Sequence, residues 1–283
     1  MTSAVKMAAS SRTHLVDVVT PWPRLTAHYK KIHGDATLMW DWFQGFFYSS
    51  VVYFAYPASV FSTPTARTDL LSYTFLLWFV QMTGALAIFH RYFAHRGYRA
   101  SRPVQFVLAV IGCLSGQGGP IFWASMHRHH HKACEDADDV HSPLHGGSFS
   151  LGQLFWSHAG YLFLDGKPRV RIGNVPDWVR YPELVVVDIL SFAIYYSFGF
   201  TVYWVGGWDA FAWVFCLSTF ISWNCVALVN SVAHMVGDTR YLAPNAPTCN
   251  ARNIWYLSFV MLGANWHNNH HAYAHTARAG FEW

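Results

Sequence analysis

Histidine is unusually frequent in this chain, and most of it is concentrated in a few short motifs. There are 17 histidines among 283 residues. Four motifs read H-R-Y-F-A-H, H-R-H-H-H, N-S-V-A-H and H-N-N-H-H. Their candidate ligands are His90, His95, His127, His130, His131, His234, His267, His270 and His271. Because neutral imidazole is the commonest metal ligand in proteins, the pattern indicates a metal site.

The spacing inside the motifs suggests how the imidazoles point. Residues at i, i+3 and i+4 share one helix face, so the second and fourth motifs should each aim three imidazoles in one direction. His90 and His95 would diverge by about 140° on an ideal α-helix. They could bind one ion from two sides or lie on either side of two ions. Nine imidazoles exceed the four ligands of a tetrahedral zinc ion. They suit two ions, although imidazole alone does not choose among iron, zinc and copper.

Long apolar stretches are available to carry these motifs. The chain is 53% hydrophobic, 18% aromatic and only 12% charged, which excludes disorder and favours a membrane protein. A helix needs roughly 20 apolar residues to cross the hydrocarbon core. Four charge-free candidates are residues 43–61, 70–89, 189–205 with an extension over 184–187, and 210–229. Short connections join them into two hairpins, so all four motifs fall on one side.

The basic residues provide an independent test of this arrangement. Of 19 Lys and Arg residues, 18 lie outside the two short connections. The positive-inside rule makes that side cytoplasmic. The predicted fold class is therefore an all-α integral membrane protein, with four transmembrane helices in two hairpins and a cytoplasmic histidine-rich di-metal cap. Two shorter apolar runs, 104–115 and 254–263, predict interfacial or buried helices.

Other features exclude further classes. The formal net charge of +4 is too small for a nucleic-acid-binding protein. Five cysteines include no C-x-x-C pair, so neither a disulfide framework nor a thiolate zinc site is indicated. The first 20 residues lack the continuous apolar run of a secretory signal peptide. Their scattered Ser and Thr leave a plastid transit peptide open.

The ordered motifs between two apolar hairpins resemble the membrane fatty acyl desaturases, specifically the stearoyl-CoA desaturase-like acyl-CoA or acyl-lipid Δ9 type. The likeness runs from about residue 40 to the C-terminus. We expect residues 1–39 to form a cytoplasmic N-terminal segment and residues 40–283 to form a single desaturase domain. Because the chain stops twelve residues after His271, where relatives continue, we expect it to be truncated at the C-terminus.

The resemblance implies an enzyme with two iron ions that uses O₂ to remove two hydrogens from a saturated acyl chain and leave a cis double bond. It implies that the nine histidines bind iron directly, and that Asn230 binds through water. Gln117 and Trp123 would line the bend of an acyl tunnel. Glu135 and Asp139 would accept hydrogen bonds from ligating imidazoles and orient them. Val226 replaces a Thr of the family at the bend, which leaves the double-bond position open.

The resemblance also leaves the partners open. No H-P-G-G haem motif is present, so electrons should come from a separate carrier. This would be cytochrome b5 with its reductase in an endoplasmic reticulum membrane, or ferredoxin in a plastid or bacterium. A basic face could hold a CoA pyrophosphate or an anionic lipid head, or serve only to orient the chain. It comprises Arg91, Arg96, Arg99, Arg102, Lys132, Lys167, Arg169 and Arg171.

Two alternatives compete with the desaturase interpretation. A di-iron membrane hydroxylase with similar motifs would insert oxygen, but the N-S-x-x-H motif disfavours it. A non-enzymatic metal transporter or sensor should place ionisable ligands at membrane depth, and the candidate spans hold none except Asp188 near one end. The other histidines that follow residue 90 are expected on the surface or behind the ligands: His129, His141, His145, His158 and His275.

Overall fold

Every regular element that the structure describes is helical. The computed structural model describes Tyr29 and residues 45–283, apart from 137–138, 140, 144–149, 165–169, 245 and 282–283. Within these residues the only β-pairings are isolated bridges from Asn253 to Asp238 and to Trp266. The prediction of an all-α chain is thereby confirmed. Except for Tyr29, the expected segment 1–39 lies outside the described residues.

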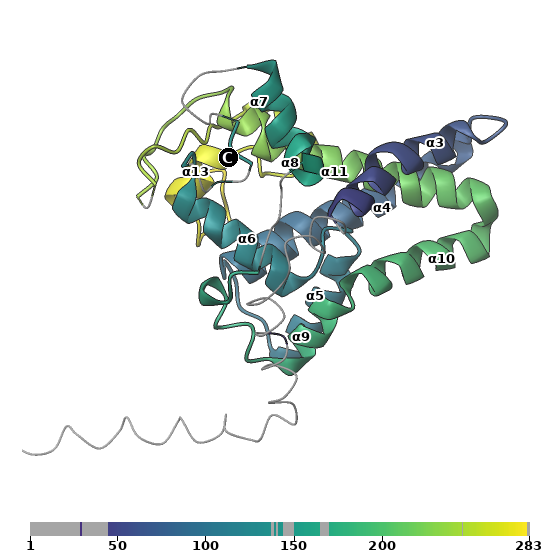
Figure 1. The fold of residues 1–283 in the computed structure, drawn as a ribbon, viewed down its shortest axis with the longest axis horizontal. Helices are drawn as coiled ribbons and strands as arrows, with labels where there is room; N and C mark the ends of the chain where they lie inside the picture. The colour runs from purple at the N-terminus through teal and green to yellow at the C-terminus, as the bar shows by residue number, and fades with distance from the viewer. Residues whose placement is uncertain are drawn as a thin grey trace, which may run out of the picture.

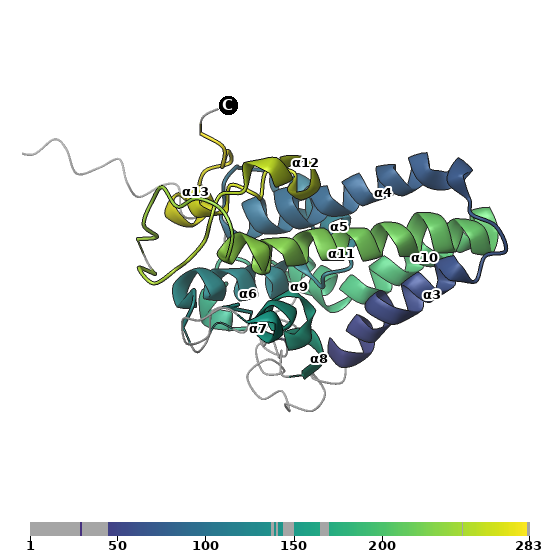
Figure 2. The same cartoon turned by 90° about the horizontal axis from the view of Figure 1, so that it is seen from above.

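The first two predicted apolar stretches form a pair of helices joined by a short turn (Figure 2). The first helix covers residues 45–50, η1 (Val51–Ala55) and α3 (Tyr56–Phe61). The second covers η2 (Thr68–Leu70), α4 (Leu71–Thr83) and η3 (Gly84–Ala94). This second helix continues beyond the charge-free window and carries the first histidine motif at its end.

The other two stretches form one helical run that folds back on itself. α10 (Ser191–Ala210), η6 (Phe211–Cys216) and α11 (Leu217–Asn230) lead into η7 (Val232–His234). Gly207 adopts φ 69° and ψ −166°, a conformation that glycine reaches because it lacks a Cβ. α10 and α11 therefore lie antiparallel (Figure 1).

Within the residues that the structure describes, two helical runs are long and apolar enough to cross a membrane, namely Thr68–Ala94 with 27 residues and Ser191–His234 with 44 residues. The longer run contains the reversal at Gly207. Residues 184–187 do not extend it, contrary to prediction, because they lie in a separate helix, α9 (Pro182–Ile189), that ends before Leu190.

The turns of the two helix pairs contact each other at one end of the molecule. Arg67, in the first turn, forms an ion pair with Asp209 at the second turn. Trp208 donates its indole N–H to Ser62 Oγ at 3.0 Å. Figure 2 shows both turns at the end of the molecule far from α6 and α13.

A buried hydrogen-bond network ties the four helices together between these ends. The hydroxyl of Tyr195 on α10 donates to Thr219 Oγ1 on α11 at 2.9 Å and lies 3.2 Å from the hydroxyl of Tyr56 on α3. Gln81 on α4 donates its amide N–H to the same Thr219 oxygen at 2.8 Å. Such interhelical bonds stabilise membrane bundles by about 0.6 kcal/mol each on average. They also fix which helix faces which.

Shorter elements gather at the end opposite the turns (Figure 2). The predicted short apolar runs form α5 (Arg102–Cys113) and the pair η8 (Trp255–Leu257) and α12 (Ser258–Met261), so their helical assignment is confirmed. The other elements are α6 (Pro120–Ala133), α7 (Leu151–Phe155), η4 (Trp156–Gly160), α8 (Tyr161–Leu164), η5 (Ile172–Asn174) and α13 (His267–Ala272). α6 and α13 carry the second and fourth histidine motifs.

Candidate metal centre

All nine motif histidines come together in two groups. Within each group, one ring nitrogen per residue lies within 4.8 Å of the corresponding nitrogen of every other member. The first group consists of His90, His95, His127, His131 and His270. The second group consists of His130, His234, His267 and His271. His90 and His270, which are 180 positions apart in sequence, therefore share one group.

α6 and α13 each divide their three histidines between the two groups. On α6, His127 and His131 belong to the first group, and His130 belongs to the second. α13 does the reverse, since its middle histidine joins the first group and its outer two join the second. The prediction that each motif aims three imidazoles in one direction is wrong. Adjacent helix residues differ by about 100°, so one helix between two sites can serve both.

His90 and His95 belong to the same group because their helix is not an α-helix. The η3 segment is a π-helix, and the His95 N–H donates to the carbonyl oxygen of His90 at 3.2 Å. An i to i+5 hydrogen bond sets residues five apart about one turn above each other. The two ring centroids are consequently 5.0 Å apart. The predicted divergence of the two imidazoles is therefore wrong.

A carboxylate from a neighbouring helix fixes the start of α6. Asp188 Oδ1 accepts hydrogen bonds from the backbone N–H groups of Ile121 and Phe122, at 2.8 and 2.9 Å. These are free donors at a helix N-terminus, where an anion is favoured. Tyr29 donates its hydroxyl to the other carboxylate oxygen at 2.6 Å. Asp188 thus fixes the N-terminus of α6, the helix that carries His127.

Arg128, a residue of the second histidine motif, connects α6 to the first histidine motif at the end of η3. Its guanidinium donates to the carbonyl oxygens of Phe93 at 2.9 Å and Ala94 at 2.7 Å, directly before His95. It also forms an ion pair with Asp177 at 2.8 Å. This role of Arg128 was not predicted from the sequence. Its place within a histidine motif was the available signal.

The two asparagines between the histidines of α13 anchor that helix. Asn268 Oδ1 accepts hydrogen bonds from the backbone N–H groups of Arg240 and Tyr241, at 2.8 and 2.9 Å. Asn269 Oδ1 accepts from the amide of Asn253 at 2.8 Å. Both asparagines are buried. The pattern H-N-N-H-H therefore combines residues that face the site with residues that hold the helix in place.

Glu135 and Asp139 lie behind the second histidine group. Glu135 Oε1 is 2.9 Å from His234 Nδ1, and Asp139 Oδ2 is 3.0 Å from His130 Nδ1. Burial lowers the pKa of His130 to about 4 even though Asp139 opposes this shift. Burial alone would raise the pKa of Asp139, but His130 and His141 outweigh it and the net shift is downward. Each carboxylate therefore accepts an Nδ1–H and leaves Nε2 with its lone pair.

Three Nε2 atoms of the second histidine group lie close together, an arrangement that fits a bound cation. His267 Nε2 lies 2.9 Å from His234 Nε2 and 3.1 Å from His271 Nε2. One proton on His267 cannot serve both neighbours, so lone pairs face each other. Burial, reinforced by neighbouring imidazoles, lowers the pKa of His267 and His271 well below 6.5 and keeps them neutral. Neutral imidazoles suit iron, zinc or copper, and the residues present are compatible with a di-metal site.

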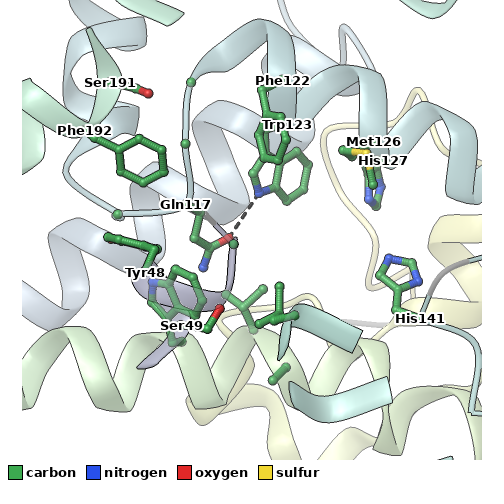
Figure 3. Close-up of a pocket in the computed structure, with 18 of the residues that line it drawn as sticks. Tyr48, Ser49, Gln117, Phe122, Trp123, Met126, His127, His141, Ser191 and Phe192 are labelled. Atoms are coloured by element: carbon green, nitrogen blue, oxygen red, sulfur yellow. Dashed lines mark hydrogen bonds between the residues drawn. The ribbon is translucent and has the colours of Figure 1, made fainter. Parts of the chain in front are cut away.

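A cavity of about 370 Å³ extends from this site into the helix bundle. Figure 3 shows His127 and His141 on one side of Gln117 and Trp123, with Phe192 on the other. Trp123 donates its indole N–H to Gln117 Oε1 at 3.1 Å. The volume falls within the range of small-ligand sites, about 300–1,000 Å³. The two residues expected at an acyl tunnel therefore lie together on the wall of one cavity.

The remaining predicted positions lie around the same cavity or behind the ligands. Asn230, the last residue of α11, lines the cavity, as does Val226. His158 Nδ1 is 3.0 Å from Ser231 Oγ. His275 Nδ1 is 2.7 Å from the carbonyl oxygen of His95. His129 belongs to neither histidine group, and His145 lies outside the described residues.

Two cysteines form a disulfide beside the site, and the sequence did not indicate it. Cys134 and Cys249 are 115 positions apart and are bonded to each other. Short-range spacing such as C-x-x-C says nothing about a pair that only the folded chain brings together. Cys134 directly follows α6, and Cys249 lies in the loop between η7 and η8. The inference from the sequence that no disulfide is indicated is wrong for this pair.

Comparison with known proteins assigns this histidine-lined helical fold to a family. The fatty acid desaturase model matches residues 68–279. The chain belongs to the fatty acid desaturase family, which confirms the resemblance drawn from the histidine motifs.

Named relatives cover most of the chain. It is 32% identical over 217 residues to the sn-2 palmitoyl-lipid 9-desaturase of Nostoc sp. (strain 36), an overlap of 74% of this chain and 71% of the relative. It is 33% identical over 229 residues to Delta-9 acyl-lipid desaturase 1 of Arabidopsis thaliana, covering 79% and 69%. It is 31% identical over 234 residues to the sn-1 stearoyl-lipid 9-desaturase of Anabaena variabilis, covering 81% and 79%.

Proposed function

We propose that this desaturase introduces a cis double bond at the Δ9 position of a saturated acyl chain held in a membrane lipid, using a di-iron centre. The observation that carries the proposal is the pair of histidine groups at one side of a cavity lined by Gln117 and Trp123. The nine histidines would bind the two irons, and Asn230 would contribute through water. The names of the three relatives support the position of the double bond.

The two irons would supply the O₂ activation that removing hydrogen from an unactivated methylene requires. The chain's own residues prepare the site for that step. Glu135 and Asp139 hold the Nδ1–H groups of His234 and His130, so that Nε2 faces the metal. Apolar side chains along the cavity, such as Phe122 and Phe192, would limit the access of water to the site. The Gln117–Trp123 hydrogen bond holds one wall of the cavity in shape.

An acyl-lipid substrate is favoured over acyl-CoA. The names of the three relatives support this choice. Two arginines of the expected basic face already have carboxylate partners: Arg96 lies 2.6 Å from Asp177, and Arg102 lies 2.6 Å from Glu183. Pairing reduces their capacity to bind a pyrophosphate. Lys167 and Arg169 of that face lie outside the described residues.

We place the chain in the membrane with four spans in two hairpins and with the histidine centre on the cytoplasmic face. The contact between the two turns, opposite α6 and α13, supports this topology. Residues 40–283 would form one desaturase domain after a cytoplasmic segment 1–39. Electrons would arrive from a separate carrier. This would be cytochrome b5 with its reductase in the endoplasmic reticulum, or ferredoxin in a plastid or bacterium.

The test is expression in a host that lacks its own Δ9 desaturase and contains both donor systems. Gas chromatography with double-bond location, after separation of lipid classes, should find new Δ9 monounsaturated chains first in glycerolipids. His131→Ala should abolish the product, whereas His129→Ala should retain it. Hydroxylated chains instead of unsaturated ones, or unchanged product in His131→Ala, would contradict the proposal.

A further inference from the structure

The Cys134–Cys249 disulfide contacts the second histidine group directly. Cys249 Sγ lies 3.3 Å from His271 Nδ1, on the side of the imidazole away from the other histidines. Cys134 is fully buried at the end of α6. Cys249 is half-buried, and its neighbour in sequence, Thr248, is exposed. The less buried residue of the pair, Cys249, thus carries the sulfur that touches a candidate ligand.

Sulfur occupies at His271 the place that oxygen occupies at two other histidines of the group. The carboxylates of Glu135 and Asp139 accept the Nδ1–H of His234 and His130. Both carboxylates come from the same short segment as Cys134, immediately after α6. Partners of this kind orient a ligating imidazole and fix its tautomer. The sulfur atom is therefore a positioning partner of His271.

We propose that Cys134 and Cys249 are a reversible thiol–disulfide pair that controls how firmly His271 is held. The oxidised pair ties the end of α6 to the loop that carries Cys249, and so fixes the acceptor at His271 Nδ1. The reduced pair releases that loop. A cytoplasmic location makes reversibility the expected behaviour, because disulfides in reducing compartments are usually transient, catalytic or redox-sensing. The consequence for metal binding rests on the proposed function, and the expected reversibility rests on the cytoplasmic location proposed with it.

The exchange needs only a dithiol reductant. A thiolate of the reductant attacks Cys249 Sγ, the sulfur of the less buried cysteine, and the Cys134–Cys249 bond breaks as Cys134 leaves and takes up a proton. The second thiol of the reductant then attacks the mixed disulfide. The products are two protein thiols and the reductant's own disulfide, so two electrons pass to the protein. Oxidation by a disulfide of the same class reverses both steps.

Thiol counting tests the pair. The metal-loaded full chain in lipid nanodiscs is equilibrated with mixtures of reduced and oxidised dithiothreitol, quenched in acid, denatured, alkylated and weighed intact. Because Cys113, Cys216 and Cys225 are free, the count should rise from three to five in one transition. Cys134→Ser should give four throughout. Five thiols under the most oxidising mixture, or three under the most reducing, would overturn the proposal.

Metal release tests the positioning role. Transfer of iron to a chelator should be about tenfold faster from the reduced than from the oxidised protein, the lower end of effects seen for partners of metal ligands. The difference should vanish in Cys134→Ser and persist in Cys113→Ser, a matched substitution at a buried cysteine elsewhere. Equal release from both states of the unmodified chain would overturn the role at His271. A three-to-five thiol transition in a chain that binds no metal would support the pair and overturn the proposed metal centre.

Discussion

The hydrogen bond behind an imidazole decides which of its nitrogens is free to bind a metal. In the second histidine group this choice is made by Glu135 at His234 and by Asp139 at His130. Both carboxylates stay ionised because neighbouring imidazoles outweigh the effect of burial on their pKa values. At the residue scale, the site therefore depends as much on these acceptors as on the histidines.

Removing the charge of Glu135 tests this dependence. Glu135→Gln should lower turnover and iron affinity by about 10- to 100-fold, since the neutral amide is a weaker acceptor for His234 Nδ1–H. Asp136→Asn, at the exposed neighbouring position, is the matched control and should change neither. Oxidation rate and iron content of the purified variants provide the measurement. Equal behaviour of the two variants would contradict the role of Glu135.

Acid should destabilise the metal-free protein. Burial lowers the pKa of His130 from 6.5 to about 4, so between these values the unfolded chain binds more protons than the folded one. The free energy of unfolding should therefore fall as the pH drops from about 6.5 towards 4, and should not depend on this group above 6.5. Asp139 does not offset the loss, because its pKa is lowered in the folded protein and its protonation in the unfolded chain near the lower end of this range destabilises in the same direction.

Thermal unfolding of the iron-free chain between pH 7.5 and 5 measures this effect. The melting temperature should decrease on acidification, and His130→Gln, which cannot be protonated in this range, should show a shallower decrease. A melting temperature that stays level over the same interval would rule out neutral, buried imidazoles.

At the scale of elements, the relation between η3 and α6 determines which histidines meet. Arg128 joins the two helices by donating to the carbonyl oxygens of Phe93 and Ala94 while pairing with Asp177. A guanidinium can make these contacts simultaneously because its five N–H donors lie in a fixed plane, which an ammonium group cannot reproduce. The first and second histidine motifs are thus held together by one side chain.

Arg128→Lys should destabilise the protein by about 2 kcal/mol, because several hydrogen bonds to a charged group are lost, and should release iron. Arg96 pairs with the same Asp177 but is 47% exposed. Arg96→Lys is therefore the control, and should cost less than about 1 kcal/mol. Chemical denaturation followed by fluorescence, with iron analysis, separates the two. Similar losses in both variants would show that the contacts to η3 do not matter.

The helices and the histidines could be predicted because their signals are local. Apolar runs and basic residues indicated the helical pairs, and four motifs indicated the nine histidines. The π-helix of η3 was not predictable, since an i to i+5 bond leaves no mark in residue type at His90 and His95. The division of the α6 histidines between two groups depends on where α13 packs. The Cys134–Cys249 bond joins positions that only the tertiary fold brings together.

At the scale of the whole molecule, the helices α6 and α13, which carry histidine motifs, lie at one end of a helix bundle (Figure 2). The turns that join the helices of each pair lie at the opposite end. Arg67 and Asp209 link the turns at one end, while both histidine groups lie at the other. The buried network of Tyr195, Thr219 and Gln81 connects the helices in between. This polarity is what a membrane enzyme needs if its substrate enters from the bilayer and its electrons arrive from water.

Labelling of single introduced cysteines tests this polarity. A membrane-impermeant maleimide applied to intact bacterial cells that carry the chain in their plasma membrane should label Ala66→Cys, in the exposed first turn, and should not label Ser150→Cys, at the start of α7. In inside-out vesicles the pattern should reverse. Labelling of both positions from the same side would contradict the four-span topology.

Counting iron in the purified chain shows whether the two histidine groups hold two irons. We predict about two irons per chain, about two in His129→Ala, and one or fewer in His95→Ala and in His234→Ala, which remove one ligand from the first and second groups respectively. A folded chain that binds no iron, or His95→Ala and His234→Ala variants that both keep two irons, would show that the two histidine groups are not iron sites.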